Sequence, residues 1–138
     1  MSDAQFKSEI QYKSFLELTS FNGWHYGTRV SDLSKQRINV GVFNPEGIRN
    51  LMKRKDIDLR VIEVQADKEL RKQRYLERDV NCDQAELERR LVADEKDFSF
   101  LGFDRVILSN NAPEDLELNT KKVCRWLQLW RDSKGKNN

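Results

Sequence analysis

Short, apolar, β-rich runs alternate with helix-patterned segments along most of this chain, and this alternation limits the folds that it can adopt. The runs cover residues 38–43, 59–64 and 103–108, and a segment with helix signals follows each of them. Strands separated by helices favour right-handed crossovers, which place the strands parallel in one sheet. A chain of 138 residues is long enough for one core. We therefore predict a single α/β domain with a parallel core sheet and flanking helices.

Capping signals indicate where three of the four predicted helices begin. Asn44-Pro45 is a helix-entry dipeptide, Asp83 and Glu86 have capping-box spacing, and Pro113 suits the first turn of a helix. The predicted helices cover residues 45–54, 68–78, 84–97 and 113 onward. The predicted core-side residues of the third are Leu87, Leu91 and Phe98. The predicted buried stripe of the last is Leu116, Thr120, Val123, Leu127 and Trp130.

The N-terminal segment has a different pattern. An amphipathic helix begins near Phe6 and gives way to a strand near Phe15. A turn at Asn22-Gly23 leads into a second strand over residues 24–28, which predicts a β-hairpin. We expect residues 1–36 to form a small, mostly β lobe, and the remaining residues, 37–138, to form the core.

Composition and charge argue against several classes of partner. Twenty-five basic and twenty-three acidic side chains leave a net charge of +2, and the two signs are interleaved. This balance disfavours nucleic acid as a partner, and no apolar run is long enough for a membrane span. Cys82, Cys124 and His25 lack metal-ligand spacing, so we expect reduced thiols and no zinc site. The sequence predicts a soluble, cytoplasmic protein.

Glu17 and the tripeptide Tyr26-Gly27-Thr28 have the chemistry of a nucleotide site, and Tyr26 follows Glu17 by nine residues. A carboxylate accepts two hydrogen bonds from the N–H groups on one edge of guanine, a pair that adenine does not supply. The hydroxyls of Tyr26 and Thr28 can donate to a phosphate, and Gly27 lets the backbone come close. Taken singly, Glu17 also fits a surface strand position and Tyr26 a packed hairpin aromatic. At this spacing we favour a nucleotide site.

Phe15-Leu16-Glu17 followed by Tyr26-Gly27-Thr28 resembles the substrate-binding lobe of guanylate kinases. In that family an apolar pair and a glutamate precede a Tyr-Gly-Thr or Tyr-Gly-Ser. The resemblance extends over most of the chain and implies that Glu17 reads the base while Tyr26, Gly27 and Thr28 bind the substrate phosphate. The implied partner is GMP or a dGMP-like monophosphate.

A pair of charged helices resembles the arginine-bearing lid of the same family. Arg74-Tyr75-Leu76-Glu77-Arg78 and, after a polar loop, Arg90-Leu91 stand where the family has Arg-Leu-x-x-Arg and Arg-Leu. The resemblance implies a lid at about residues 74–91, with Arg78 and Arg90 as catalytic groups that neutralise the phosphoryl group in flight. On composition alone, a solvated charged helix pair fits as well, because neighbouring acids balance the arginines.

The chain departs from the guanylate kinase pattern in two places. Where the family has a strand that ends in an acidic residue, this chain reads Val42-Phe43-Asn44-Pro45-Glu46-Gly47, so only Asn44 and Glu46 remain there as polar side chains. The Gly-x-x-x-x-Gly-Lys-Ser/Thr loop that cradles ATP phosphates does not occur in these 138 residues. We therefore expect no metal ligands, and binding of ATP and Mg²⁺ only if a segment with that loop is supplied.

Two interpretations of the function stay open. The first is a guanylate-kinase-like nucleotide-binding protein whose complete form transfers phosphate from MgATP to a (deoxy)nucleoside monophosphate, while the chain as given is inactive. The alternative is a non-catalytic guanylate-kinase-like interaction module or inhibitor that binds a protein partner. Loss of the acidic strand end favours the module, whereas the retained lobe and lid residues favour the kinase.

The missing loop segment also affects the predicted sheet. In the family, a strand lies between the two that residues 38–43 and 60–64 resemble. Its loss would leave buried backbone groups unpaired, which a fold does not tolerate. We expect these two strands either to pair directly or to receive a strand from a partner chain, for example by self-association.

Overall fold

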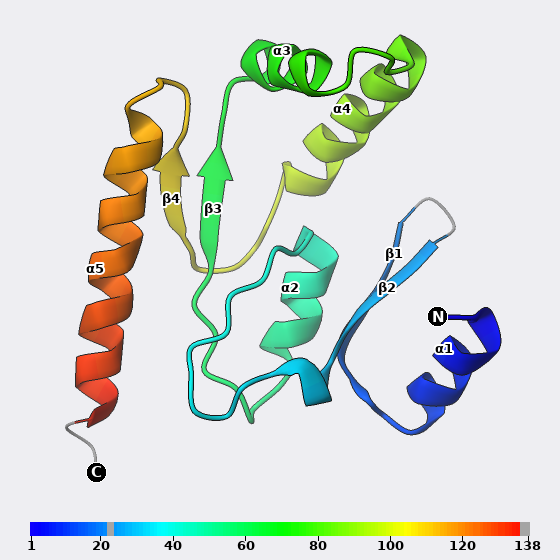
Figure 1. The fold of residues 1–138 in the computed structure, drawn as a ribbon, viewed down its shortest axis with the longest axis vertical. Coiled ribbons are helices and arrows are strands. Elements are labelled where there is room, and N and C mark those ends of the chain that lie inside the picture. The colour runs from blue at the N-terminus through cyan, green and yellow to red at the C-terminus, as the bar shows by residue number, and fades with distance from the viewer. Residues whose placement is uncertain (22–23, 136–138) are drawn as a thin grey trace. The chain divides into compact units, whose positions relative to one another are not determined.

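The computed structural model describes residues 1–21 and 24–135, which form a mixed α/β structure (Figure 1). In these residues the elements, in chain order, are α1 (Asp3–Gln11), β1 (Phe15–Phe21), β2 (Trp24–Arg29), the 3-10 helix η1 (Val30–Asp32), α2 (Pro45–Met52), β3 (Ile62–Gln65), α3 (Lys68–Arg78), α4 (Gln84–Phe98), β4 (Val106–Ser109) and α5 (Asp115–Gly135). The chain divides into two compact units, Met1–Arg60 and Val61–Asn138. None of the described helices combines the length and the hydropathy that crossing a membrane requires.

The first unit is built on the antiparallel hairpin of β1 and β2. Its two strands confirm the predicted hairpin, while the predicted turn at Asn22-Gly23 lies outside the described residues. The helix α1 begins at Asp3, earlier than predicted, because Ser2 and Gln5 form a capping box. Within the unit, α2 packs on β1, and Asn50 Nδ2 donates to the carbonyl oxygen of Leu18 at 3.0 Å.

The predicted strand at residues 38–43 is wrong, because this segment is coil that joins neither sheet. Val40 is 84% exposed and Val42 is 100% exposed, so no packing selects a strand there. The Asn39 side chain bonds to the backbone of Ser34 in both directions: Oδ1 accepts from Ser34 N and Nδ2 donates to Ser34 O, each at 2.9 Å. Such local side-chain bonds compete with a strand ladder.

The second unit contains the parallel pair of β3 and β4. Ile62 lies opposite Val106 and Gln65 opposite Ser109, and the ladder continues with Asn110 N donating to Gln65 O at 2.8 Å. The predicted strands at 59–64 and 103–108 are therefore present, each displaced toward the C-terminus. The expected pairing of 38–43 with 60–64 is wrong, since β3 takes β4 as its neighbour. Among the described residues the parallel sheet has two strands and is not the larger core sheet that the sequence predicts.

Each unit has a small apolar core. The buried apolar side chains are Phe15 and Leu51 in the first unit, and Leu87, Leu91, Leu101 and Leu108 in the second. Of the core positions predicted for residues 84–97, Phe98 is wrong, because it is 45% exposed. The predicted buried stripe of α5 is wrong at Leu116, which is 68% exposed, and at Thr120, which is also exposed. Val123, Leu127 and Trp130 are half-buried, and none of the α5 residues is fully buried.

Candidate functional site

Glu17 is the buried charged side chain of the described structure, with 8% of its surface exposed. It lies on β1 opposite Thr28 of β2, just after a register irregularity between Phe15 and Glu17. Residues two apart on a strand share a face, so Phe15 and Glu17 both point inward. A carboxylate that leaves water in this way needs hydrogen bonds in the fold to offset its desolvation.

Thr28 provides those hydrogen bonds. Its backbone N donates to Glu17 Oε1 at 3.0 Å, and its hydroxyl Oγ1 donates to the same oxygen at 2.9 Å. Glu17 Oε2 accepts no hydrogen bond from any residue that the structure describes. The hairpin thus fixes one carboxylate oxygen and leaves the other to accept from an incoming donor.

The first turn of α2 borders the open oxygen. Asn44 caps the helix, and its Oδ1 accepts from Gly47 N at 2.9 Å. A Cβ atom on Gly47 would lie 3.2 Å from Asn44 Oδ1 and 3.5 Å from Glu17 Oε2. A side chain at this position would therefore crowd the Asn44 cap, and the helix start lies within contact distance of the carboxylate. The positive end of the helix dipole favours a negative charge there.

Tyr26 and Gly27 are exposed on β2. Tyr26 is 53% exposed and pairs with Thr19 across the hairpin. A Cβ atom on Gly27 would lie 2.8 Å from both Phe15 Cδ1 and Leu18 Cδ2, so packing within the hairpin already requires glycine. The predicted role of Gly27, to admit a phosphate close to the backbone, stays a prediction.

The two predicted lid arginines meet at one aromatic ring in the second unit. Cζ of Arg78 on α3 lies 5.3 Å from the centroid of the Tyr75 ring, and Cζ of Arg90 on α4 lies 5.9 Å from it. Arg90 Nε also pairs with Glu86 Oε1 at 2.9 Å, and this hydrogen bond raises the pKa of Arg90. In the first unit Glu17 and Thr28 are thus in direct contact, and in the second unit Arg78 and Arg90 share the Tyr75 ring.

Two residues take part in this geometry without having a role in the sequence-based prediction. Tyr75 is three residues before Arg78, a spacing that makes side chains neighbours on a helix. This spacing could have predicted the contact between the two side chains. Thr19 borders the helix start, since its Cγ2 would lie 3.4 Å from a Cβ on Gly47. No local pattern indicates that contact, because it depends on how α2 packs on β1.

The side chains near the predicted acidic strand end do not gather into a cluster of metal ligands. Residues 1–21 and 24–135 contain no group of three His, Cys, Asp or Glu side chains that could hold a metal. Asn44 Oδ1 is occupied by the cap of α2, and Glu46 is exposed in the first turn of that helix. Cys82 and Cys124 are free thiols.

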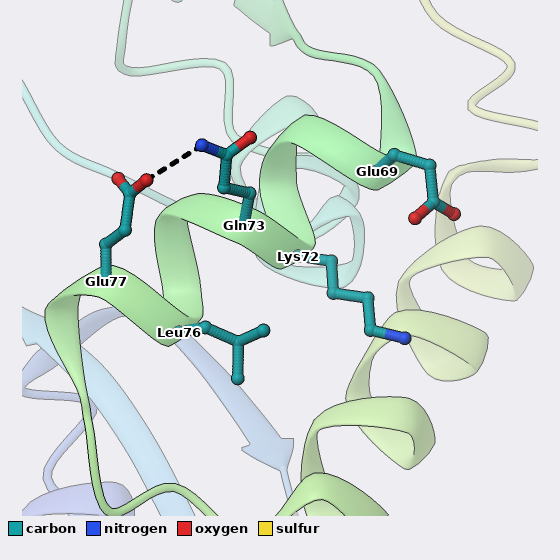
Figure 2. A pocket seen from close by; sticks show the side chains of 5 residues that line it. All are labelled: Glu69, Lys72, Gln73, Leu76 and Glu77. Carbon is teal, nitrogen blue, oxygen red and sulfur yellow. Dashed lines mark hydrogen bonds between the residues drawn. The ribbon is translucent and has the colours of Figure 1, made fainter.

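A second candidate for a ligand site is an open hollow on the surface of α3 (Figure 2). Its lining side chains are Glu69, Lys72, Gln73, Leu76 and Glu77. Gln73 Nε2 donates to Glu77 Oε1 at 2.8 Å, and Lys72 pairs with Glu88 of α4. Because three of the four polar lining side chains are already bonded within the protein, the hollow lacks the several convergent free donors and acceptors of a ligand site.

No protein-family model matches this chain, and no curated protein matches it.

Proposed function

We propose that this protein is a guanylate-kinase-like nucleotide-binding protein whose first unit binds a nucleoside monophosphate and prefers guanine. The observation that supports this most is the Glu17 carboxylate, which is buried, bonded through Oε1 and open at Oε2. Guanine presents two N–H donors on one edge, whereas adenine presents an acceptor at the corresponding ring nitrogen. A buried acceptor left without its donor is costly, so such a site discriminates between the two bases.

The contacts of Thr28 suggest how both guanine donors are satisfied. One donor bonds to Oε2. Rotation of the Thr28 hydroxyl releases a lone pair of Oε1 for the second donor, while the backbone N of Thr28 keeps the carboxylate in place. The Thr28 hydroxyl and the exposed Tyr26 hydroxyl are then free to bond to the ligand.

The same proposal assigns Arg78 and Arg90 to the phosphoryl group. Guanidinium forks match the oxygens of a phosphoryl group and neutralise its charge. It also assigns the β3–β4 pair to the larger parallel core sheet of the guanylate kinase fold. Transfer of phosphate from MgATP is proposed only for a protein that also has the phosphate-binding loop, because these 138 residues contain no such motif.

The test is a titration of the full chain with GMP and, separately, with AMP, followed by the backbone amide resonances of Gly27 and Thr28. We expect GMP to perturb both resonances at concentrations about tenfold lower than AMP. Glu17→Gln keeps the shape and an acceptor for Thr28 but removes the charge and places an amide donor at the other oxygen position, so the preference should disappear.

The matched control is Asp32→Asn, which removes one exposed negative charge from η1 in the same unit. This variant should keep the preference for GMP. The proposal is wrong if neither nucleotide perturbs Gly27, or if AMP binds as well as GMP and Glu17→Gln changes nothing.

A further inference from the structure

The Tyr75 ring is where two cations from different helices converge. Arg78 lies one turn further along α3, whereas Arg90 belongs to α4, and both Cζ atoms lie within 5.9 Å of the ring centroid. A guanidinium group within about 6 Å of a ring centroid is attracted to the electron-rich face of the ring. The half-buried Tyr75 side chain is therefore a shared contact of two cationic side chains.

The two arginines differ in what else holds them. Arg90 donates from Nε to Glu86 Oε1 at 2.9 Å, a bond within α4. Arg78 has no ion-pair partner in the part of the chain that the structure describes, and Tyr75 is its interaction there. The position of Arg78 therefore depends on the ring far more than the position of Arg90 does.

The α3–α4 hairpin itself does not depend on this ring. Ion pairs that cross between the two helices include Lys68–Glu95 and Lys72–Glu88. Leu87 and Leu91 of α4 are buried, with 2% and 4% of their surfaces exposed. A change confined to the Tyr75 ring should therefore leave the hairpin folded.

We propose that Tyr75 is a positioning residue for phosphate binding, because its ring holds Arg78 at the same side chain that Arg90 contacts, so that both arginines bind one polyphosphate. The inference rests on the proposed function for the role of the two arginines and adds the residue that arranges them. Ordering a long, flexible side chain costs conformational entropy, so an arginine already held in place loses less on binding. Two guanidinium groups around one ring also offer more donors to phosphoryl oxygens than one.

The experiment uses the full chain and tripolyphosphate as the probe, titrated calorimetrically at low ionic strength. Tyr75→Leu removes the ring and should weaken binding roughly fivefold, the factor expected for the loss of exposed cation–π contacts. Tyr75→Phe keeps the ring and should bind within about twofold of the parent chain. The matched control is Tyr12→Leu, which removes a tyrosine that is 79% exposed in the first unit and should change nothing.

A double-mutant cycle separates positioning from a structural role. Arg78→Gln should weaken binding at least as much as Tyr75→Leu, and the double variant should bind no more weakly than Arg78→Gln alone, since the ring acts through this arginine. Losses that add fully would overturn the proposal. So would absence of tripolyphosphate binding by the parent chain, or a Tyr75→Phe variant as weak as Tyr75→Leu.

A measurement on the unaltered protein covers the case in which Tyr75→Leu fails to fold. The side-chain protons of Arg78 and Arg90 should both show nuclear Overhauser contacts to the Tyr75 ring protons, and absence of these contacts would refute the arrangement. Failure of this inference is also distinct from failure of the proposed function. If only the inference about Tyr75 fails, the preference for GMP measured at Gly27 stays intact. If the proposed function fails, that preference is absent both in the unaltered chain and in the Tyr75 variants.

Discussion

The two units hold their candidate functional side chains in opposite ways. In the first unit, Glu17 is 8% exposed, and a backbone N–H of the neighbouring strand binds its carboxylate. In the second unit, Arg78 and Arg90 are exposed, and an aromatic ring and a carboxylate on the same surface hold them. Folding of the hairpin fixes the buried group, whereas local side-chain contacts fix the exposed pair. The first arrangement should therefore be coupled to stability, and the second should be nearly independent of it.

The largest expected effect is the absence of kinase activity, and it concerns the functional side chains of both units. Neither the carboxylate nor the arginine pair replaces a loop of backbone N–H groups that binds the phosphates of ATP, and the chain has no motif for one. We expect no ATP-dependent phosphorylation of GMP or dGMP by this chain in a coupled assay with Mg²⁺. Turnover that persists through repurification would show that the two units already suffice and would end this prediction.

The next effect compares the stability cost of one carboxylate in each unit. Glu17→Ala leaves the Thr28 backbone N–H without its acceptor, which should cost about 1–3 kcal/mol of unfolding free energy. Glu17→Gln keeps an acceptor and should recover most of that loss. The matched variant in the second unit is Glu88→Ala, which removes an exposed partner of Lys72 and should cost clearly less. Urea unfolding followed by tryptophan fluorescence measures the unfolding free energy of all three variants. Equal losses for Glu17→Ala and Glu88→Ala would contradict the expected difference between a buried and an exposed carboxylate.

The smallest expected effect is a difference of sign between two carboxylates of α4. Burial is the main cause that raises the pKa of Asp94, with Arg71 opposing the rise and Asp97 adding to it. A hydrogen bond from Lys72 is the main cause that lowers the pKa of Glu88. The contribution of Asp94 to stability is thus full below its unfolded pKa and is lost as the pH rises through its folded pKa. The contribution of Glu88 is present above its unfolded pKa and is lost as the pH falls through its folded pKa.

It follows that at pH 7 Asp94→Asn should raise the thermal midpoint and Glu88→Gln should lower it. Both differences should shrink as the pH falls below about 4, where carboxylates become protonated. Thermal unfolding followed by circular dichroism at pH 7 and at low pH measures both variants. Shifts of the same sign at pH 7 would contradict the two pKa directions.

The helices of the second unit could be predicted closely because their signals are local. The predicted range 68–78 agrees with α3, and 84–97 agrees with α4 to within one residue. The capping box predicted at Asp83 is only half present: Asp83 accepts from Ala85 N, whereas Glu86 pairs with Arg89 and Arg90. Glu86 could bond either to the backbone N–H of Asp83 or to the arginines one turn later, and the sequence is compatible with both. In the structure it forms the ion pairs.

The strand at 38–43 and the full site could not be predicted in the same way, because they depend on tertiary neighbours. β-Rich composition produces a strand only where another strand can pair with it, and Val42 has no such neighbour in the described structure. The facing of Glu17 and Thr28 follows from the predicted hairpin. The approach of Gly47 to Glu17, and of Arg90 to Tyr75, depends on how elements pack, which no local pattern encodes.

The exposed coil around Val40 makes the first unit open to cleavage by a protease. Proteases cut extended, solvent-exposed chain in preference to helices and strands, and Arg37 offers trypsin a bond in this coil. A cut after Arg37 would leave Glu17 on one fragment and Gly47 on the other. The two fragments would still be joined by the bonds from Asn50 to the Leu18 carbonyl and from Arg54 to the Leu16 carbonyl. The candidate site is thus divided between two stretches of chain, and a nicked protein that elutes as one species would retain both halves of it.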